Sequence, residues 1–164
     1  MSQTKDNAPD CEPIVESALG QELEKEECKV LATVMQVRKL KNGETLVQEG
    51  DKDSTLFVLT AGKLDVFSVI AEKETRVYGM KVGEVAGTRA FVDRTARKAT
   101  LRAKGDTTVY TLDPEAFEGL LETHPRVVYK VMRGLFRITH MNLMRMNVES
   151  QALANYIHKT GGRF

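Results

Sequence analysis

The chain has 164 residues, of which 41% are hydrophobic and 29% charged, and its formal net charge is +1. This length suits one folded domain with helical extensions, and no apolar run approaches the roughly 20 residues that a membrane span needs. No signal peptide opens the chain, so we expect a cytoplasmic protein without a membrane partner.

The N-terminal part is acidic. Residues 1–13 are polar and poor in apolar side chains, which predicts a mobile tail. Apolar residues between Ser17 and Val34 recur at near-helical intervals and predict a helix that is interrupted near Gly20. Residues 1–30 carry eight acidic and three basic side chains, whereas residues 126–164 carry one and seven. The two ends could attract each other, the basic end could bind an acidic partner or nucleic acid, or both could be solvated helix faces.

Residues 14–125 form the predicted central domain. Short β-rich segments alternate with turn residues such as the Asn-Gly pair in Lys41–Glu44, a pattern that indicates an antiparallel sandwich or barrel. The predicted strands cover residues 35–40, 45–48, 55–60, 63–70, 76–80, 99–103 and 107–112.

Two helices are predicted after the strands. Asp113 can cap the first, Pro114 suits its first turn, and it should stop before Pro125. Residues 126–164 are predicted as a long helix and tail, weakened only at Gly134. Its apolar seam approximates a heptad that polar residues interrupt, which favours partial packing or dimerisation over a complete coiled coil. The seam consists of Val128, Met132, Leu135, Thr139, Asn142, Met146, Leu153 and Tyr156.

The segment from Gly83 to Ala103 is the most informative. With Lys41–Glu44, Glu49–Asp51 and Leu56–Leu59, its Arg97-Lys98-Ala99-Thr100 group resembles the motifs of cyclic-nucleotide-binding domains. The resemblance covers about residues 20–145. It implies a mainly β fold, an antiparallel β-roll or jelly-roll barrel with an N-terminal helix and C-terminal helices.

In that family a short helix begins at Gly-Glu-Leu-Ala, where backbone N–H groups and an arginine bind the cyclic phosphate and the glutamate binds the ribose 2′-hydroxyl. Two registers fit this chain. Gly83 begins the matching Gly-Glu-Val-Ala but lies 14 residues before Arg97. Gly87 lies ten residues before Arg97, which is the family's spacing, and we prefer this register. The implied phosphate site is Gly87, Thr88, Arg89, Ala90, Arg97, Lys98 and Ala99, with Glu84 as the ribose contact only in the other register.

The preferred register changes the chemistry of the site. Thr88 stands where the family has glutamate, and losing a hydrogen bond to a charged group costs about 1.5–3 kcal/mol, or roughly 10- to 150-fold in affinity. Arg89, Arg94, Arg97 and Lys98 bring more positive charge than one cyclic phosphate offsets, so some should point to solvent. Arg97 either contacts an anion or pairs with an acidic residue of the barrel.

The resemblance leaves two main functions open. The first is a non-catalytic regulatory module with a degenerate cassette, which acts on another signalling protein or binds an atypical anion such as cyclic di-GMP. The second is a working cAMP or cGMP receptor that relies on Arg97 and the backbone of Gly87–Ala90. In either case the resemblance implies that the helix from Arg126 moves when a ligand binds. That movement would be passed to a second copy of the chain or to a separate protein.

Other classes of function lack sequence support. Residues 140–164 are too few for a helix-turn-helix unit, so we expect no nucleic-acid partner. No Ser-His-Asp pattern or P-loop is present, and Cys11 and Cys28 show no metal-ligand spacing with the histidines. We therefore expect neither an enzyme nor a cofactor, and a cyclic nucleotide is the ligand that the resemblance leaves open.

Overall fold

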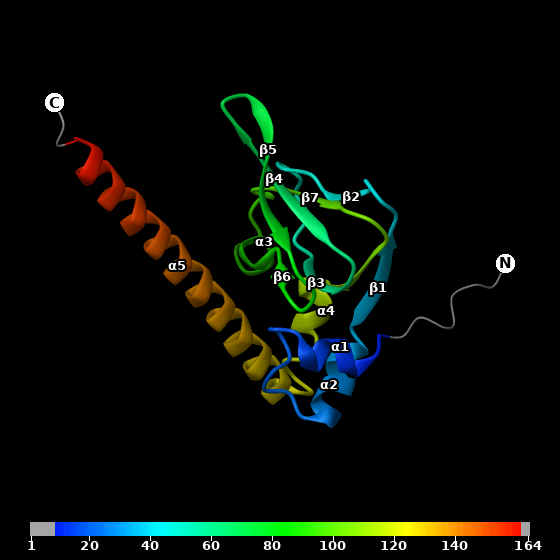
Figure 1. Ribbon diagram of the computed structural model, residues 1–164. Coiled ribbons are helices and arrows are strands. Elements are labelled where there is room, and N and C mark those ends of the chain that lie inside the picture. The colour runs from blue at the N-terminus through cyan, green and yellow to red at the C-terminus, as the bar shows by residue number, and fades with distance from the viewer. Residues whose placement is uncertain (1–8, 162–164) are drawn as a thin grey trace.

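The computed structural model describes residues 9–161, which form two β-sheets flanked by helices (Figure 1). The helices are α1 (Cys11–Glu16), α2 (Lys25–Ala32), α3 (Thr88–Asp93), α4 (Pro114–Glu118) and α5 (Pro125–Gly161). The strands are β1 (Met35–Leu40), β2 (Thr45–Val47), β3 (Leu56–Ala61), β4 (Leu64–Ile70), β5 (Lys73–Met80), β6 (Val85–Ala86), β7 (Thr100–Ala103) and β8 (Thr107–Leu112).

Each sheet has four strands, in the orders β1-β8-β3-β6 and β2-β7-β4-β5. Every pairing is antiparallel, and β1 pairs with β8 from Met35 opposite Leu112 to Leu40 opposite Thr107. Apolar side chains of both sheets form one buried cluster. Its members are Leu40, Leu46, Val47, Phe57, Leu59, Leu64, Met80, Leu101, Ala103 and Val109. The predicted mainly β, antiparallel β-roll with flanking helices is confirmed.

The N-terminal region is interrupted near Gly20 as predicted, but over a longer stretch. Helix α1 ends at Glu16 and α2 begins only at Lys25, so residues 17–24 are not helical. The Ser17 hydroxyl donates a 2.6 Å hydrogen bond to Ile14 O and accepts one from Leu19 N, which turns the chain. A Cβ at Gly20 would overlap the Ile14 carbonyl, so the turn also needs glycine. Residues 1–8 of the predicted tail lie outside the described residues, and α1 includes Cys11–Pro13.

The C-terminal helices pack on the outside of the first sheet. Helix α4 is capped as predicted, with Asp113 Oδ1 accepting from Glu115 N at 2.9 Å, but it ends at Glu118 rather than near Thr123. Helix α5 begins at Pro125 and buries only its first half. Its buried residues are Val127, Val128, Val131, Gly134, Leu135 and Ile138. All of these except Gly134 join α1, α2 and the first sheet in a second core cluster.

The acidic N-terminal part and the basic C-terminal helix pair directly. Lys130 contacts Glu27, while Arg133 and Arg137 lie 3.4 and 2.8 Å from Glu22. Of the alternatives that the charge distribution left open, mutual attraction is therefore part of the fold. No helix among residues 9–161 is long and apolar enough to cross a membrane.

Candidate functional site

The backbone around Gly87 makes a sharp entry into a short helix. Strand β6 ends at Ala86, Gly87 adopts a left-handed conformation with φ of +87°, and α3 begins at Thr88. A side chain at Gly87 would be strained by this φ and would overlap Nη1 of Arg97. The glycine thus allows the backbone to lie directly against Arg97.

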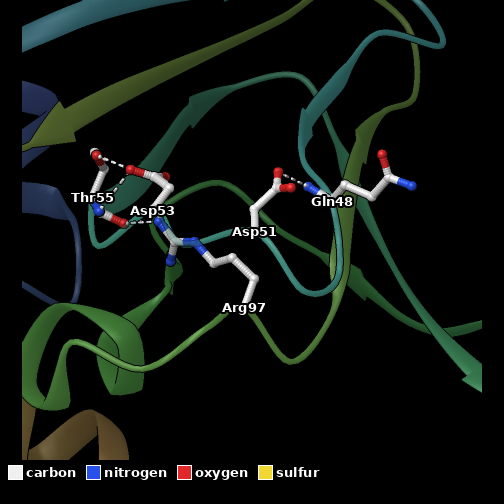
Figure 2. Close-up of polar contacts among 5 residues, drawn as sticks. All are labelled: Gln48, Asp51, Asp53, Thr55 and Arg97. Atoms are coloured by element: carbon white, nitrogen blue, oxygen red, sulfur yellow. Dashed lines mark hydrogen bonds and ion pairs between the residues drawn. The ribbon is translucent and has the colours of Figure 1, made fainter.

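Arg97 is the central side chain of this region. It is only 4% exposed, and its Nη2 donates to Asp53 Oδ2 at 2.7 Å and to the carbonyl oxygen of Thr55 (Figure 2). Its guanidinium carbon also lies 5.0 Å from the ring centroid of Phe57, at the distance of a cation–π contact. Three residues from one stretch of chain, 53–57, therefore hold this cation below the surface.

Backbone bonds fix the two segments that meet at Arg97. Arg97 N donates to Asp51 O at 2.8 Å, and Gly50 N donates to Arg97 O at 2.9 Å. Glu49 N donates to Thr100 Oγ1 at 2.9 Å. Figure 2 also shows the Asp51 carboxylate accepting from Gln48 N, which closes the turn beside Arg97. The position of Arg97 is therefore set before any ligand arrives.

Asp53 is ionised under ordinary conditions. Burial acts to raise its pKa, but the hydrogen bond from Arg97, two bonds from Thr55 and the charge of Arg97 together leave the pKa below its usual value. Because a charged Asp53 neutralises Arg97, an incoming anion meets an arginine that already has one carboxylate partner.

Part of the Arg97 guanidinium stays without a partner. Among residues 9–161, Nε and Nη1 are buried and form no hydrogen bond, while Nη1 faces Gly87. Unpaired buried donors are costly and rare in folded proteins. Arg97 thus offers hydrogen-bond donors next to the N-terminus of α3.

The other predicted cations point away. Arg89 and Lys98 are exposed, and Arg94 forms a 2.7 Å ion pair with Glu118 at the surface. Thr88 and Ala99 are half-buried, and Ala90 is buried. The expectation that some of the four cations point to solvent is confirmed, and only Arg97 is buried.

Glu84, the ribose contact in the other register, has partners of its own. Its Oε1 accepts from the Tyr78 hydroxyl at 2.6 Å and its Oε2 from Lys81 N at 3.1 Å. The residue lies in the turn between β5 and β6, before Gly87 and not within α3. Its carboxylate closes this turn.

Asp53, Thr55 and Phe57 are the residues that sequence reasoning missed. They precede Arg97 by 40 to 44 positions, and no spacing in the sequence links them to it. The sequence analysis expected only that Arg97 either contacts an anion or pairs with an acidic residue of the barrel. The structure identifies that acidic residue as Asp53.

Comparison with known proteins agrees with this fold. The family model described as "Cyclic nucleotide-binding domain" matches residues 37–124, more than half of the chain. A solved cyclic nucleotide-binding domain from Methylobacillus flagellatus KT has a TM-score of 0.78 at 22% identity, covering 82% of this chain and 79% of that one.

Two curated relatives match this chain over only a small part of their own length. A cGMP-dependent protein kinase of Plasmodium berghei is 28% identical over 100 residues, 61% of this chain and 11% of the kinase. A cAMP-dependent protein kinase regulatory subunit of Emericella nidulans is 30% identical over 91 residues, 56% of this chain and 22% of the subunit. The chain thus spans less than a quarter of either relative. On the strength of the family match, the chain belongs to the cyclic nucleotide-binding domain family.

Proposed function

We propose that this chain is a non-catalytic regulatory module that binds a cyclic mononucleotide weakly, through a degenerate cassette at residues 87–100, and acts through contact with another protein. The observation that carries the proposal is Arg97. It is 4% exposed, and two of its nitrogens, beside the Gly87 turn, have no hydrogen-bond partner within residues 9–161. A buried cation with free donors is suited to an anion such as a cyclic phosphate.

Two features support weak binding. Thr88, the first residue of α3, has no carboxylate for a ribose hydroxyl, and Asp53 already neutralises Arg97. The first feature alone would lower affinity by roughly 10- to 150-fold relative to a cassette with a glutamate. The preferred register at Gly87 agrees with the start of α3 at Thr88 and with the engagement of Glu84 by Tyr78.

The ligand class follows from the relatives. Their printed names refer to cGMP-dependent and cAMP-dependent kinases. We therefore propose cAMP or cGMP as the nucleotide, and we find no support for the cyclic di-GMP that the sequence also left open. Because the relatives are matched over only 11% and 22% of their lengths, their kinase activities do not extend to this chain.

Calorimetric titration of the whole chain with cAMP and with cGMP tests this proposal. We expect dissociation constants well above micromolar, and no binding by R97A. The matched control is K104A, which removes an exposed cation outside residues 87–100 and should leave binding nearly unchanged. Equal binding by the unaltered chain and R97A would overturn the proposal.

The alternative is a working cAMP or cGMP receptor in which Arg97 and the backbone of Gly87–Ala90 suffice. The free donors of Arg97 favour it, since one well-placed charged contact can hold a phosphate without the ribose carboxylate. Micromolar binding that R97A abolishes would decide for this alternative and against the weak module.

We further propose a second copy of the chain as one partner, held through the outer half of α5. Residues 139–161 are exposed throughout, yet they include Met141, Leu143, Met144, Met146, Val148, Leu153, Tyr156 and Ile157. Only three Lys, Arg, Asp or Glu side chains, Arg145, Glu149 and Lys159, lie in this stretch. A sparsely charged apolar helix of this kind suits a partner helix of the same composition.

A further inference from the structure

The outer half of α5 touches the β-roll at one polar point. The guanidinium carbon of Arg145 lies 4.9 Å from the ring centroid of Tyr78, on β5. Among the described residues, no other hydrogen bond, ion pair or cation–π contact joins residues 139–161 to a strand. Arg145 therefore supplies the polar contact between this half of the helix and a strand.

Tyr78 connects that contact to the turn before the cassette. Its hydroxyl donates to Glu84 Oε1 at 2.6 Å, and the other oxygen of Glu84 accepts from Lys81 N at 3.1 Å. The hydrogen bond to Glu84 raises the pKa of Tyr78 above its usual value, burial adds to this, and Arg145 acts in the opposite direction. Arg145, Tyr78 and Glu84 thus influence one another directly.

The same turn has a second connection to α5. Ala18 N donates to Gly83 O at 2.9 Å, and a Cβ at Gly134 would lie 3.0 Å from Leu19 O. Residues 18–19 are therefore wedged between the Lys81–Glu84 turn and α5. Gly134 and Arg145 are 11 residues apart, about 16 Å along a helix. The turn is thus linked to α5 indirectly at two well-separated heights, through residues 18–19 at Gly134 and through Tyr78 at Arg145.

We propose that Arg145, Tyr78 and Glu84 form a latch that couples the Lys81–Glu84 turn, and through β6 the backbone at Gly87, to the position of the outer half of α5. A cation–π contact at a partly exposed site changes an equilibrium by about two- to fivefold, so the latch is weak enough to open. Its use as a signal of ligand occupancy rests on the proposed function, because a ligand shifts α5 only by binding its positions unequally.

Hydrogen exchange of the ligand-free whole chain tests the latch itself. In R145Q we expect exchange at residues 81–87 and 139–150 to rise by about two- to fivefold, although Arg145 makes no direct contact with the first segment. The matched control is K159Q, which also removes a positive charge from the exposed part of α5. Equal exchange of R145Q and K159Q at residues 81–87 would overturn the proposal.

Tyr78→Phe separates the two halves of the latch, since it keeps the ring under Arg145 and removes the bond to Glu84. It should raise exchange at residues 81–87, and R145Q added to it should have less effect there than alone. Fully additive effects would show that no coupling passes through Tyr78.

Nucleotide titration keeps this inference apart from the proposed function. If R145Q loosens residues 81–87 but no nucleotide binds, the latch stands and the ligand assignment fails. If nucleotide binds and depends on Arg97 while R145Q leaves residues 81–87 unchanged, the latch fails and the ligand assignment stands.

Discussion

At Gly87 the backbone lies so close to Arg97 that the glycine serves two purposes. It supplies the positive φ, and its missing side chain leaves room for Nη1. Gly43 has a similar φ of +80° but nothing within 4 Å of its would-be Cβ. An added methyl group at Gly43 would therefore meet only the strain of the positive φ, whereas one at Gly87 would also overlap Arg97.

Both G87A and G43A should lose about 1–2 kcal/mol of unfolding free energy from the left-handed conformation. G87A should lose about 1–3 kcal/mol more, because the added methyl group displaces Arg97 from Asp53. Urea unfolding of the two variants measures the difference. Equal losses would mean that Arg97 moves aside without cost.

Thr88 is the position at which the cassette should be repairable. If Gly87 starts the cassette, T88E restores a carboxylate at the start of α3, and affinity for cAMP or cGMP should rise by roughly 10- to 150-fold. T88Q, of similar size but uncharged, is the control in the same calorimetric titration. Unchanged affinity in T88E together with weakened binding in E84Q would favour the register that begins at Gly83.

Arg97 could be selected from the sequence, whereas its partners could not. The ten-residue spacing from Gly87 and the Ala99-Thr100 that follows made Arg97 a candidate. Asp53 reaches it only because β3 and the cassette lie side by side in the folded chain. A pairing between residues 44 positions apart leaves no periodic trace in one sequence.

Among the elements, α2 and α5 are joined by the ion pair of Glu27 and Lys130. Both side chains are mostly buried, 15% and 17% exposed. The hydrogen bond from Lys130 is the main reason that the pKa of Glu27 lies below its usual value, and burial opposes it. Glu27 Oε1 also accepts from Glu24 N at 3.0 Å, which closes the capping box of α2.

This lowered pKa predicts a pH dependence. The pair should contribute fully above the unfolded glutamate pKa of about 4.3 and be lost as the pH falls through the lower folded value. E27Q should lower the free energy of unfolding by about 1–2 kcal/mol at pH 7, a loss between those typical of exposed and of buried ion pairs. Its amide oxygen can still accept from Glu24 N, so the loss reports mainly on the pair with Lys130.

Urea unfolding of the unaltered chain and E27Q, at neutral pH and at steps below about pH 4.3, measures this dependence. The difference between the two chains should shrink as the pH falls. A difference that stays constant down to the lowest pH at which both fold would show that Glu27 does not titrate with folding.

The elements differ in how well sequence predicts them. β1 and β8 were predicted to the residue, because alternation and turn residues bound them clearly. The interruption predicted near Gly20 is present, but the helix predicted from residue 17 begins only at Lys25. Ser17 and Gly20 turn the chain through contacts with Ile14 that hydrophobic periodicity does not report.

At the scale of the whole molecule, the outer half of α5 is the surface through which we propose that two copies of the chain associate. In Figure 1 this half extends past the β-roll to the C-terminal end of the chain. Its side chains are exposed along residues 139–161, with Leu153 at 60% and Met146 at 60%. Both belong to the apolar seam that the sequence predicted.

We expect the chain to sediment as a dimer at micromolar concentration and the double variant M146K/L153K to sediment as a monomer, because buried like charges oppose helix pairing. N147K/N155K adds the same charge at polar positions of the helix and serves as the control. A monomeric unaltered chain, or a double variant that remains dimeric, would contradict the proposed self-association.

The sequence alone predicted the fold class, the order of most strands, the long last helix and Arg97 as one of four candidate cations, because these depend on local patterns and short spacings. Tertiary structure alone decided which of four cations is buried, that Asp53 neutralises it, and that Arg145 meets Tyr78. Burial and pairing between distant segments arise from the packing of the whole chain, so no short stretch of sequence carries them.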